Sequence, residues 1–380
     1  MTVPATATTS GERYDAIVVG VGGMGSAALH HLARRGKRVL GLERFDVPNE
    51  LGSSHGITRI IRLAYYEHVA YVPLLRRAYE LWRELEGVAG ERLLHVTGSI
   101  DAGPPGQLIF PGSLRSCEEH GLPHEVLDPA EVARRFPAYR LDPAHMAVLQ
   151  PQGGFLLPER CIVAHVRASG AEVRTGERVL GWEPVGEGVR VRTERAEYEA
   201  ERLVLTAGAW MSELAGLPVV AERQVLAWLR PLRPELFEPE RFPVFNLQVD
   251  EEERYYGFPV FGIPGFKLGR YHHLREQGPA DELDREPRPE DERVLREFAR
   301  RFFPAGDGPA LTLKTCLFEN SPDEHFILDR LPDAPQVVVG GGFSGHGFKF
   351  CSVVGEILAD LALEGETRHE IGFLRLGRLG

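Results

Sequence analysis

The stretch YDAIVVGVGGMGSAALHHLARRGKRVLGLE, at residues 14–43, decides the fold of this chain. A short hydrophobic run, Ala16–Val19, leads into a glycine-rich turn and a helix-like stretch that reaches Arg35. A second hydrophobic run, Val39–Leu42, follows and ends at Glu43. Strand, glycine turn, helix, strand and acid in this order are typical of the first βαβ unit of a dinucleotide-binding fold.

The glycine turn has the spacing G-x-G-x-x-G at Gly20, Gly22 and Gly25. Gly20 allows a tight turn, Gly22 lets the backbone approach a pyrophosphate, and Gly25 lets helix and strand pack closely. The N-terminus of the helix offers free N–H groups and the positive end of its dipole to phosphates, and Glu43 suits a ribose hydroxyl. Glycine turns are common, but the complete unit favours a dinucleotide site over a structural turn.

The composition is that of a globular protein and argues against several classes. The chain has 380 residues, 43% hydrophobic and 26% charged, so more than one domain is expected. A net charge of -11 argues against nucleic acid as a partner. No hydrophobic run is long enough to span a bilayer, so no membrane partner is expected. Residues 1–13 are small and polar, and we expect a flexible tail there and no secretory signal.

The cysteines and lysines carry further information. The four cysteines show no C-x-x-C pair or metal-ligand spacing, which indicates the reducing cytoplasm and no metal site. Only four of the 44 basic residues are lysines, and lysine differs from arginine because it can lose its proton when buried. Lys267 and Lys349 lie in glycine- and aromatic-rich segments, which makes them candidates for a functional site, whereas chance explains Lys37.

A second glycine turn, GGGFSG at residues 340–345, follows the hydrophobic run Val337–Val339 and precedes a helix-like stretch over 347–363. No strand and acid follow it at the distance that a nucleotide site needs, so we interpret it as a second helix N-terminus. Such a turn suits a flavoprotein, in which one end of the chain holds the ADP half and the other reaches the isoalloxazine ring. Reduced flavin is negative near N1 and the C2 carbonyl, and a helix N-terminus with Lys349 would stabilise that charge.

Taken together, these motifs resemble the monomeric sarcosine oxidase and N-methyltryptophan oxidase family of FAD-dependent amine oxidases. The resemblance runs from about residue 14 over nearly the whole chain. It rests on GVGGMG (20–25) with Glu43, GSSHGITRIIR (52–62), YVPLLRRAYELW (71–82), RQV (223–225), YYGFP (255–259), GFKLG (265–269), SPDEHFILD (321–329) and GFSGHGFKF (342–350).

The resemblance implies a mixed α/β fold with two domains. A discontinuous, Rossmann-like FAD-binding domain of the glucose oxidase type would comprise residues 14–92, 150–224 and 310–380. A mixed-sheet substrate domain would comprise residues 93–149 and 225–309. The implied reaction is oxidation of the secondary amine of an N-methyl amino acid by O2, which gives the amino acid, formaldehyde and hydrogen peroxide. The expected partners are this small molecule and O2, and the expected state is a monomer.

The same resemblance assigns roles to single residues. Cys316 matches the cysteine that bonds covalently to the flavin 8α-methyl group. Arg62 and Lys349 match the pair that holds the substrate carboxylate, and two cations would orient this anion. The expected cofactor contacts are Gly20, Gly22, Met24, Gly25, Glu43, Arg44, Ser53, Thr58, Cys316, Gly345, Gly347 and Lys349.

Further positions are expected to take part in catalysis or to line the pocket. Arg59 and His55 match residues beside the flavin, and Tyr256 matches a pocket tyrosine. Lys267 matches a lysine implicated in oxygen activation, where a cation would stabilise developing superoxide.

This chain departs from the family's pattern at the position of the active-site histidine. The position four residues after Lys267 holds Tyr271, and two histidines follow it. An extra residue, such as Arg270, would shift the register, so His272 is the expected catalytic histidine and His273 the alternative.

Several alternatives stay open. Phe318 replaces a tyrosine and Ser54 the first residue of a usual His-His pair, and both lie where substrate preference or flavin tuning can change. The segment ENSPDE (319–324) and the pair Ala227-Trp228 are closer to the N-methyltryptophan branch, so a bulkier or cyclic amino acid remains an alternative substrate. An NAD-dependent dehydrogenase and a non-catalytic flavin-binding module are the other readings.

Overall fold

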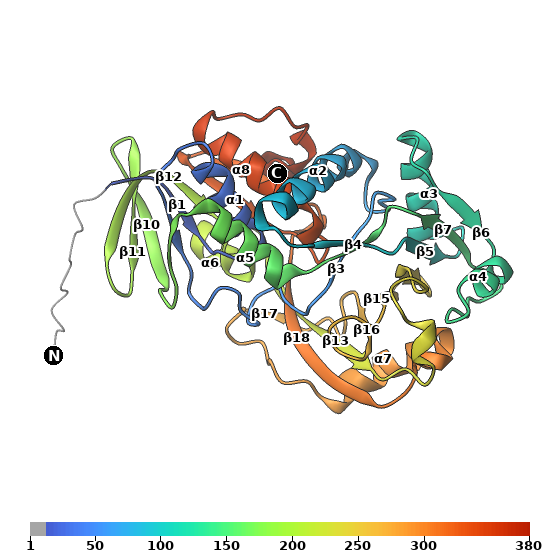
Figure 1. The fold of residues 1–380 in the computed structure, drawn as a ribbon. Coiled ribbons are helices and arrows are strands. Elements are labelled where there is room, and N and C mark those ends of the chain that lie inside the picture. Colours follow the sequence, from blue (N-terminus) through green and yellow to red (C-terminus); the bar gives the residue numbers. More distant parts are fainter. Residues whose placement is uncertain (1–12) are drawn as a thin grey trace.

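The structure is a computed structural model that describes residues 13–380, and it contains two large sheets with helices packed against them (Figure 1). The tail expected over residues 1–13 lies outside the described residues, except for Arg13. Within residues 13–380, every helix is too short or too polar to span a bilayer. The mixed α/β architecture confirms the predicted fold class.

The first sheet has eight strands and contains the βαβ unit predicted from residues 14–43. Strand β1 lies between β2 and β12 and runs parallel to both, and β20 lies parallel to the C-terminal half of β12. Val19, Leu205 and Val339 are therefore neighbours in register, and the chain leaves β1 and β20 at the same edge of the sheet. Its strands are β1 (Tyr14–Val19), β2 (Val39–Leu42), β9 (Glu172–Arg174), β10 (Val179–Val185), β11 (Gly188–Thr193), β12 (Glu197–Leu205), β19 (Ile327–Leu331) and β20 (Ala334–Gly341).

Helices α1 and α8 pack together on this sheet, α5 packs on α1, and α2 packs on α5 and α8 (Figure 1). Small residues allow the close approach of α1 and α8: a Cβ at Gly355 would lie 2.5 Å from the carbonyl carbon of Ala27. Every residue of α8 from Cys351 to Ala362 is buried, so this helix forms the centre of the packing. The helices are α1 (Gly23–Ala33), α2 (Val72–Ala89), α3 (Ile109–Glu119), α4 (Pro129–Arg135), α5 (Pro158–Ser169), α6 (Met211–Ala215), α7 (Pro289–Phe302) and α8 (Cys351–Leu363).

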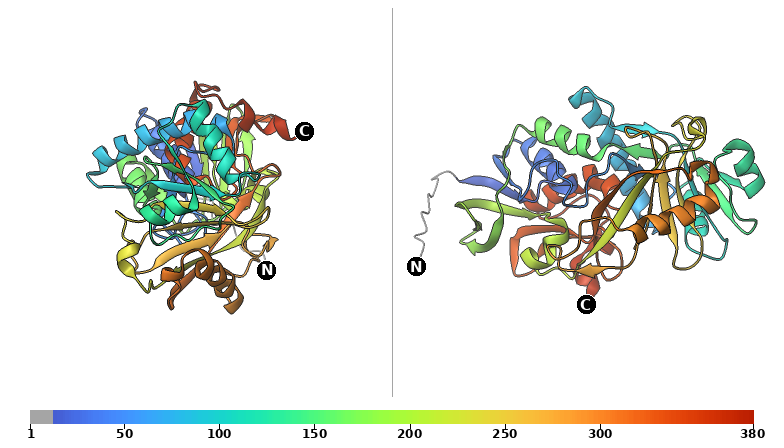
Figure 2. Two further views of the ribbon diagram at one scale, coloured as in Figure 1. Left: turned by 90° about the vertical axis from the view of Figure 1, so that its right-hand side faces the viewer. Right: turned by 90° about the horizontal axis from the view of Figure 1, so that it is seen from below.

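The second sheet has nine mostly antiparallel strands, and α7 lies over them, as the view from below in Figure 2 shows. Aromatic side chains fill the space between: Phe298 stacks on Tyr255, and Phe303 stacks on Phe245. The strands are β5 (Ser99–Gly103), β6 (Glu125–Leu127), β7 (Met146–Gln150), β13 (Val220–Leu229), β14 (Val244–Gln248), β15 (Arg254–Phe258), β16 (Phe266–Arg270), β17 (Gln277–Gly278) and β18 (Ala310–Asn320). A small third sheet contains β3 (Arg59–Ile61), β4 (Leu94–Val96) and β8 (Gly154–Leu156).

The two-domain division remains a proposal, and the strand pairing bears on its boundaries. β18 pairs with β13 along its whole length, from Val220 opposite Asn320 to Leu229 opposite Ala310. The ranges expected from the sequence divide β13 at residue 224 and assign β18 to the FAD-binding domain. We therefore propose that both strands belong structurally to the second sheet and carry the connection between the domains.

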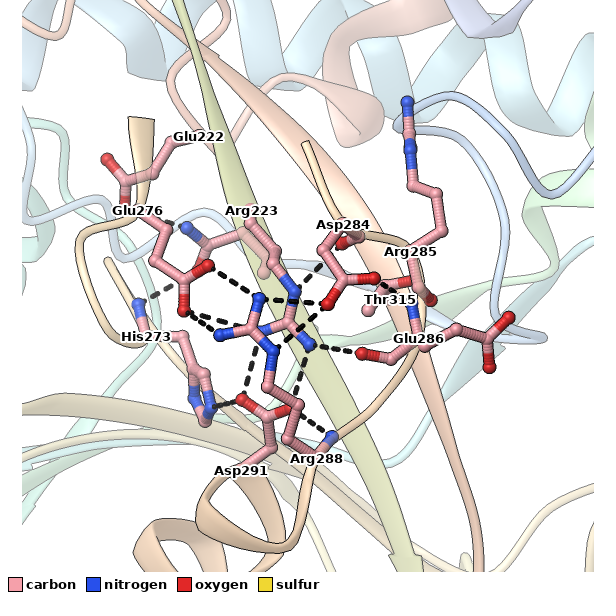
Figure 3. A network of polar contacts seen from close by, with 11 residues as sticks. Glu222, Arg223, His273, Glu276, Asp284, Arg285, Glu286, Arg288, Asp291 and Thr315 are labelled. Atoms are coloured by element: carbon pink, nitrogen blue, oxygen red, sulfur yellow. Dashed lines mark hydrogen bonds and ion pairs between the residues drawn. The ribbon is translucent and has the colours of Figure 1, made fainter. Parts of the chain in front are cut away.

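A buried ion-pair network anchors the loop that joins β17 to α7 (Figure 3). Arg223 of β13 donates two hydrogen bonds to the carboxylate of Asp291, of 2.8 and 2.9 Å, and two more to the backbone carbonyls of Asp284 and Glu286. His273 contacts the same carboxylate at 2.9 Å. The side chains of Arg223 and Asp291 are at most 1% exposed, so each charge depends on the other for its stability.

Removal of one partner of this pair is expected to be costly. In Asp291→Ala, the Arg223 guanidinium stays buried without its carboxylate, and the free energy of unfolding should fall by about 3–5 kcal/mol. Urea denaturation at pH 7 measures this loss. Glu290→Gln is the matched control, since Glu290 pairs with Arg293 in solvent and its loss should change stability by less than about 1 kcal/mol.

The Arg223–Asp291 pair makes a pH-dependent contribution to the free energy of unfolding. Burial opposes ionisation of Asp291, but the Arg223 guanidinium outweighs it and lowers the pKa of Asp291 from 3.8 to about 2. Because the folded-state pKa is lowered, the contribution is complete above about pH 4 and is lost as the pH falls through about 2. Equal unfolding free energies for the wild type and Asp291→Ala at pH 7 would contradict this account.

Candidate functional site

A cavity opens at the sheet edge where the chain leaves β1 and β20, and it extends to β15 and β18 of the second sheet. It joins the two glycine turns, which lie more than 300 residues apart in the sequence. Of the residues predicted for the site, those that line this cavity are Gly20, Gly22, Met24, Glu43, Arg44, Ser53, Arg59, Tyr256, Cys316, Gly345, Gly347 and Lys349. Those that do not line it are Gly25, His55, Thr58, Arg62, Lys267 and His272.

The first glycine turn has the geometry expected of it. Gly20 has φ +85°, which only glycine adopts readily. A Cβ at Gly22 would meet no atom within 4 Å, so the backbone there is open to a ligand. A Cβ at Gly25 would lie 1.8 Å from the carbonyl oxygen of Gly20, so helix α1 can pack on β1 only with glycine at this position.

Glu43 lines the same end of the cavity and stabilises the first glycine turn. Its carboxylate accepts hydrogen bonds from the N–H of Val21 at 2.8 Å and of Phe45 at 3.0 Å. Burial raises the pKa of Glu43 above its usual value, and these N–H groups partly offset the effect. Each carboxylate oxygen keeps acceptor capacity for a further donor, such as a ribose hydroxyl.

The loop held by the Arg223 network binds residues of the cavity wall. Asp281 of this loop accepts hydrogen bonds from Arg44 at 2.8 Å and from the indole N–H of Trp210 at 2.8 Å, and both of these residues line the cavity. Arg285 donates to the carbonyl of Leu51 at 2.8 Å. The loop therefore ties the second sheet to the first across the cavity.

Aromatic side chains enclose the opposite end. Tyr256, Tyr271 and Phe318 cluster around Cys316, with ring centroids 5.1 Å apart for the two tyrosines and 6.0 Å for Tyr271 and Phe318. All four side chains line the cavity. This end can hold a small apolar group and keep water away from it.

The structure places Tyr271, and not His272, in the cavity wall. Strand β16 pairs regularly with β13 and β15 up to Arg270, directly before Tyr271. His272 lies outside the lining, where Glu222 and Glu324 bind its two ring nitrogens at 3.0 and 3.1 Å. These contacts raise the pKa of His272 to about 9, so the ring is a charged structural partner rather than a free base.

His273, the alternative histidine, also has a partner: its Nε2 atom contacts the carboxylate of Asp291 in the loop network. Burial lowers the pKa of His273 below its usual value. Neither histidine therefore has a ring nitrogen in the cavity.

Cys316 is the cysteine that lines the cavity; Cys117, Cys161 and Cys351 are buried elsewhere. Burial raises the pKa of the Cys316 thiol, and the cations Arg59, Lys267 and Arg285 act in the opposite direction. Lys314, two residues before Cys316, pairs with Glu50 through its ammonium group.

Lys267 lies directly behind the cavity wall. Its ammonium group donates to the carbonyls of Gly56 at 2.8 Å and Thr58 at 2.6 Å, and it lies 4.1 Å from the ring centroid of Phe258, which lines the cavity. Burial, followed by the charge of Arg59, lowers the pKa of Lys267 well below its usual value. Arg59 itself donates to the carbonyls of Ser53 and Thr58.

The two cations expected to bind a carboxylate are close to each other but differ in access. Lys349 lines the cavity and donates to the carbonyl of His346 at 2.7 Å; burial, followed by the charge of Arg62, lowers its pKa to about 7. Arg62 is 1% exposed, and its Nη2 atom donates to both carboxylate oxygens of Glu67, at 2.9 and 2.8 Å. Its Nε lies 3.7 Å from the buried carboxylate of Asp101.

Two buried polar groups are incompletely satisfied beside the cavity. Both ring nitrogens of His55 lack a hydrogen-bond partner among the described residues, and burial lowers its pKa to about 3. The Oε2 atom of Glu319, which lines the cavity, also lacks one.

Sequence reasoning did not single out Glu67 or Glu319. Glu67 is five residues from Arg62, and opposite charges near a predicted site are a signal that might have been weighed. Glu319 carries no sequence signal, because a single acid on a strand is most often solvated.

Comparisons with known proteins agree with this geometry. The family described as FAD dependent oxidoreductase matches residues 15–361. The chain is 42% identical to the monomeric sarcosine oxidase of Streptomyces avermitilis, with 96% of this chain and 98% of the relative covered. It is 38% identical to the monomeric sarcosine oxidase of Bacillus sp. strain B-0618, with 96% of each covered. It is 35% identical to the N-methyl-L-tryptophan oxidase of Yersinia pestis, with 96% and 99% covered.

Solved structures have the same fold. NikD, an unusual amino acid oxidase essential for nikkomycin biosynthesis, superposes with a TM-score of 0.82 at 28% identity, with 96% of this chain and 97% of NikD covered. The L-proline dehydrogenase from P. horikoshii also has a TM-score of 0.82, with 97% and 98% covered, and at 20% identity this likeness concerns the fold alone.

Proposed function

The chain belongs to the FAD dependent oxidoreductase family, and on this premise we propose that it oxidises the secondary amine of sarcosine or a similar N-methyl amino acid with O2. The products are the amino acid, formaldehyde and hydrogen peroxide. The observation that carries the proposal is the continuous cavity between the G-x-G-x-x-G turn and the aromatic end at Cys316 and Lys349. Membership of this family argues against the alternative function of an NAD-dependent dehydrogenase.

The residues present fit FAD. The open backbone at Gly22 and the carboxylate of Glu43 suit the ADP half, and the turn at Gly345 and Gly347 suits the isoalloxazine half. When bound, FAD supplies the two-electron acceptor for the amine.

The chain's own residues would bind and orient the substrate. Lys349 and Arg62 provide two cations for its carboxylate, and the substrate would displace part of the Arg62–Glu67 pair. A carboxylate beside Lys349 would favour its charged form and reverse the lowering of its pKa.

The other cations and the aromatic rings would act on the amine. Arg59 and Lys267 lie near this end, and like charges disfavour the ammonium form, so the amine would bind neutral. Tyr256, Tyr271 and Phe318 would exclude water around the N-methyl group.

The visible spectrum of the purified protein tests the function. The protein should be yellow, and anaerobic addition of sarcosine should bleach the flavin bands; admission of O2 should restore them with release of hydrogen peroxide. N-methyl-L-tryptophan serves as the second substrate in the same experiment. Bleaching by that compound but not by sarcosine would favour the alternative, and a colourless protein would refute the proposal.

Replacement of Lys267 tests its role toward oxygen. A cation beside O2 stabilises the negative charge that O2 gains, so Lys267→Met should slow reoxidation by about 100-fold or more and reduction by sarcosine much less. Stopped-flow absorbance separates the two half-reactions. Lys37→Met, between α1 and β2, is the control and should leave both rates unchanged. Equal slowing of both half-reactions would indicate a structural role for Lys267.

We also infer a monomeric protein of the cytoplasm. The named relatives of Streptomyces avermitilis and Bacillus are monomeric enzymes. All four cysteines are free thiols, as is usual in a reducing compartment. Gel filtration with light scattering tests the oligomeric state.

A further inference from the structure

The backbone turn at residues 56–58 binds the ammonium group of Lys267. Within residues 13–380, the hydrogen bonds of this group go to the carbonyl of Gly56 at 2.8 Å, and to the carbonyl and the hydroxyl of Thr58 at 2.6 and 3.1 Å. An ammonium group has three N–H donors, so each of them has a partner in this turn. The position of the turn therefore determines where the charge of Lys267 lies.

The backbone of this turn has a rare conformation. The N–H of Thr58 donates to the carbonyl of Gly56 at 2.8 Å, which closes a γ-turn with Ile57 at its centre. Ile57 has φ +72°, the sign of the strained form of this turn, and a β-branched residue seldom adopts it. Such a conformation persists only where neighbouring groups hold it.

Glu159, in the first turn of α5, binds the N–H groups of the same turn. Its Oε1 atom accepts from the N–H of Gly56 at 2.6 Å and from the N–H of Ile57 at 3.0 Å. Because the acceptor is a carboxylate, these hydrogen bonds are charge-assisted and stronger than bonds to a neutral oxygen. Glu159 does not line the cavity, and its charge also favours the charged form of Lys267, against burial and the charge of Arg59.

We propose that Glu159 is a positioning residue for Lys267: it holds the strained turn in the form whose carbonyls fix the ammonium group behind the cavity wall. The inference rests on the proposed role of Lys267 toward oxygen, and it adds a residue that acts only through the turn. A displaced cation stabilises developing negative charge less well, so the loss of Glu159 should affect reoxidation of the flavin more than its reduction.

Two variants separate the hydrogen bonds of Glu159 from its charge. Glu159→Ala removes the acceptor, so reoxidation should slow by about 10-fold and reduction by sarcosine much less. Glu159→Gln keeps an acceptor oxygen without the charge, so it should keep most of the wild-type reoxidation rate. Stopped-flow absorbance of the flavin measures both half-reactions.

Glu86→Ala is the matched control. One carboxylate oxygen of Glu86 also accepts from two successive N–H groups, those of Leu93 and Leu94, at 2.8 Å each. None of these three residues lines the cavity. This variant therefore removes the same kind of contact elsewhere in the fold, and it should leave both half-reactions unchanged.

Amide hydrogen exchange tests the position of the turn without turnover. In the protein as purified, the peptide that covers residues 53–58 should exchange faster in Glu159→Ala than in the wild type, because its N–H groups lose their acceptor. Glu159→Gln should retain most of the protection of this peptide. Glu86→Ala should leave it unchanged and should speed exchange at Leu93 and Leu94 instead.

Several outcomes would overturn the inference. These are unchanged exchange over residues 53–58 in Glu159→Ala, equal slowing of its two half-reactions, and reoxidation of Glu159→Gln as slow as that of Glu159→Ala. If Glu159→Ala does not fold, Glu159→Asp shortens the side chain, and wild-type exchange and reoxidation in that variant would have the same meaning. A wild-type protein without flavin would instead refute the proposed function, and the exchange experiment would still test the turn.

Discussion

Replacement of Cys316 by alanine is expected to abolish covalent attachment of FAD. After acid precipitation, the wild-type flavin should stay in the pellet and give a fluorescent band on a denaturing gel. The Cys316→Ala flavin should pass entirely into the supernatant, or the protein should be colourless. We propose this bond because Cys316 is the cysteine in the cavity wall; burial raises the pKa of its thiol, and the cations Arg59, Lys267 and Arg285 oppose that rise.

The chemistry of the bond balances with the proposed activity. A thioether between the sulfur and the 8α carbon replaces the S–H bond and one C–H bond. It releases two protons and two electrons, and O2 accepts them to give hydrogen peroxide. Cys117→Ala is the control, because Cys117 is buried in α3 outside the cavity. Wild-type flavin that washes out freely on denaturation would contradict the proposal, and Cys316 would then be a packed core thiol.

Replacement of Arg62 by alanine is expected to impair substrate binding strongly. Loss of one cation from a buried carboxylate site costs about 2–5 kcal/mol, so kcat/KM for sarcosine should fall by about 30-fold or more, mostly through KM. The flavin should stay bound. Steady-state peroxide production and the flavin absorbance measure the two effects.

Two comparisons make this result specific to the carboxylate. An N-methyl amine without a carboxylate should react equally with the wild type and with Arg62→Ala, since Arg62 would have no anion to hold. Arg62→Lys keeps a charge but loses the planar guanidinium group, so its kcat/KM for sarcosine should lie between those of the wild type and Arg62→Ala. Arg62→Ala also leaves Glu67 and Asp101 without their cation, so its melting temperature should be measured in parallel. Unchanged kinetics with sarcosine would refute the assignment.

The first βαβ unit could be predicted closely from the sequence. The second strand was expected at Val39–Leu42 and has these bounds, because its signal is local hydrophobicity between a helix and an acid. The second glycine turn was also expected, as a helix N-terminus. Helix α4 was not predicted from the sequence. Pro129 stands at the start of α4, where Asp128 caps the helix, and this position tolerates proline.

The candidate site was predicted in part. The residues that line the cavity along both glycine turns follow from sequence motifs, because glycines are required where backbone meets ligand. The role of His272 was not predictable, because Glu222 of β13 and Glu324 of the turn before β19, each about 50 residues away in the sequence, bind its ring.

The sequence by itself determined the cofactor class, the fold class and the positions of the two glycine turns, since strand and helix periods and glycine spacing are local properties. The tertiary structure decided which charges are paired and which are open. It pairs Arg62 with Glu67 and Lys314 with Glu50. Within residues 13–380, it leaves the buried Oε2 atom of Glu319 without a hydrogen-bond partner. Pairing and burial depend on contacts between distant segments, and these contacts determine whether a charged side chain is free to act on a ligand.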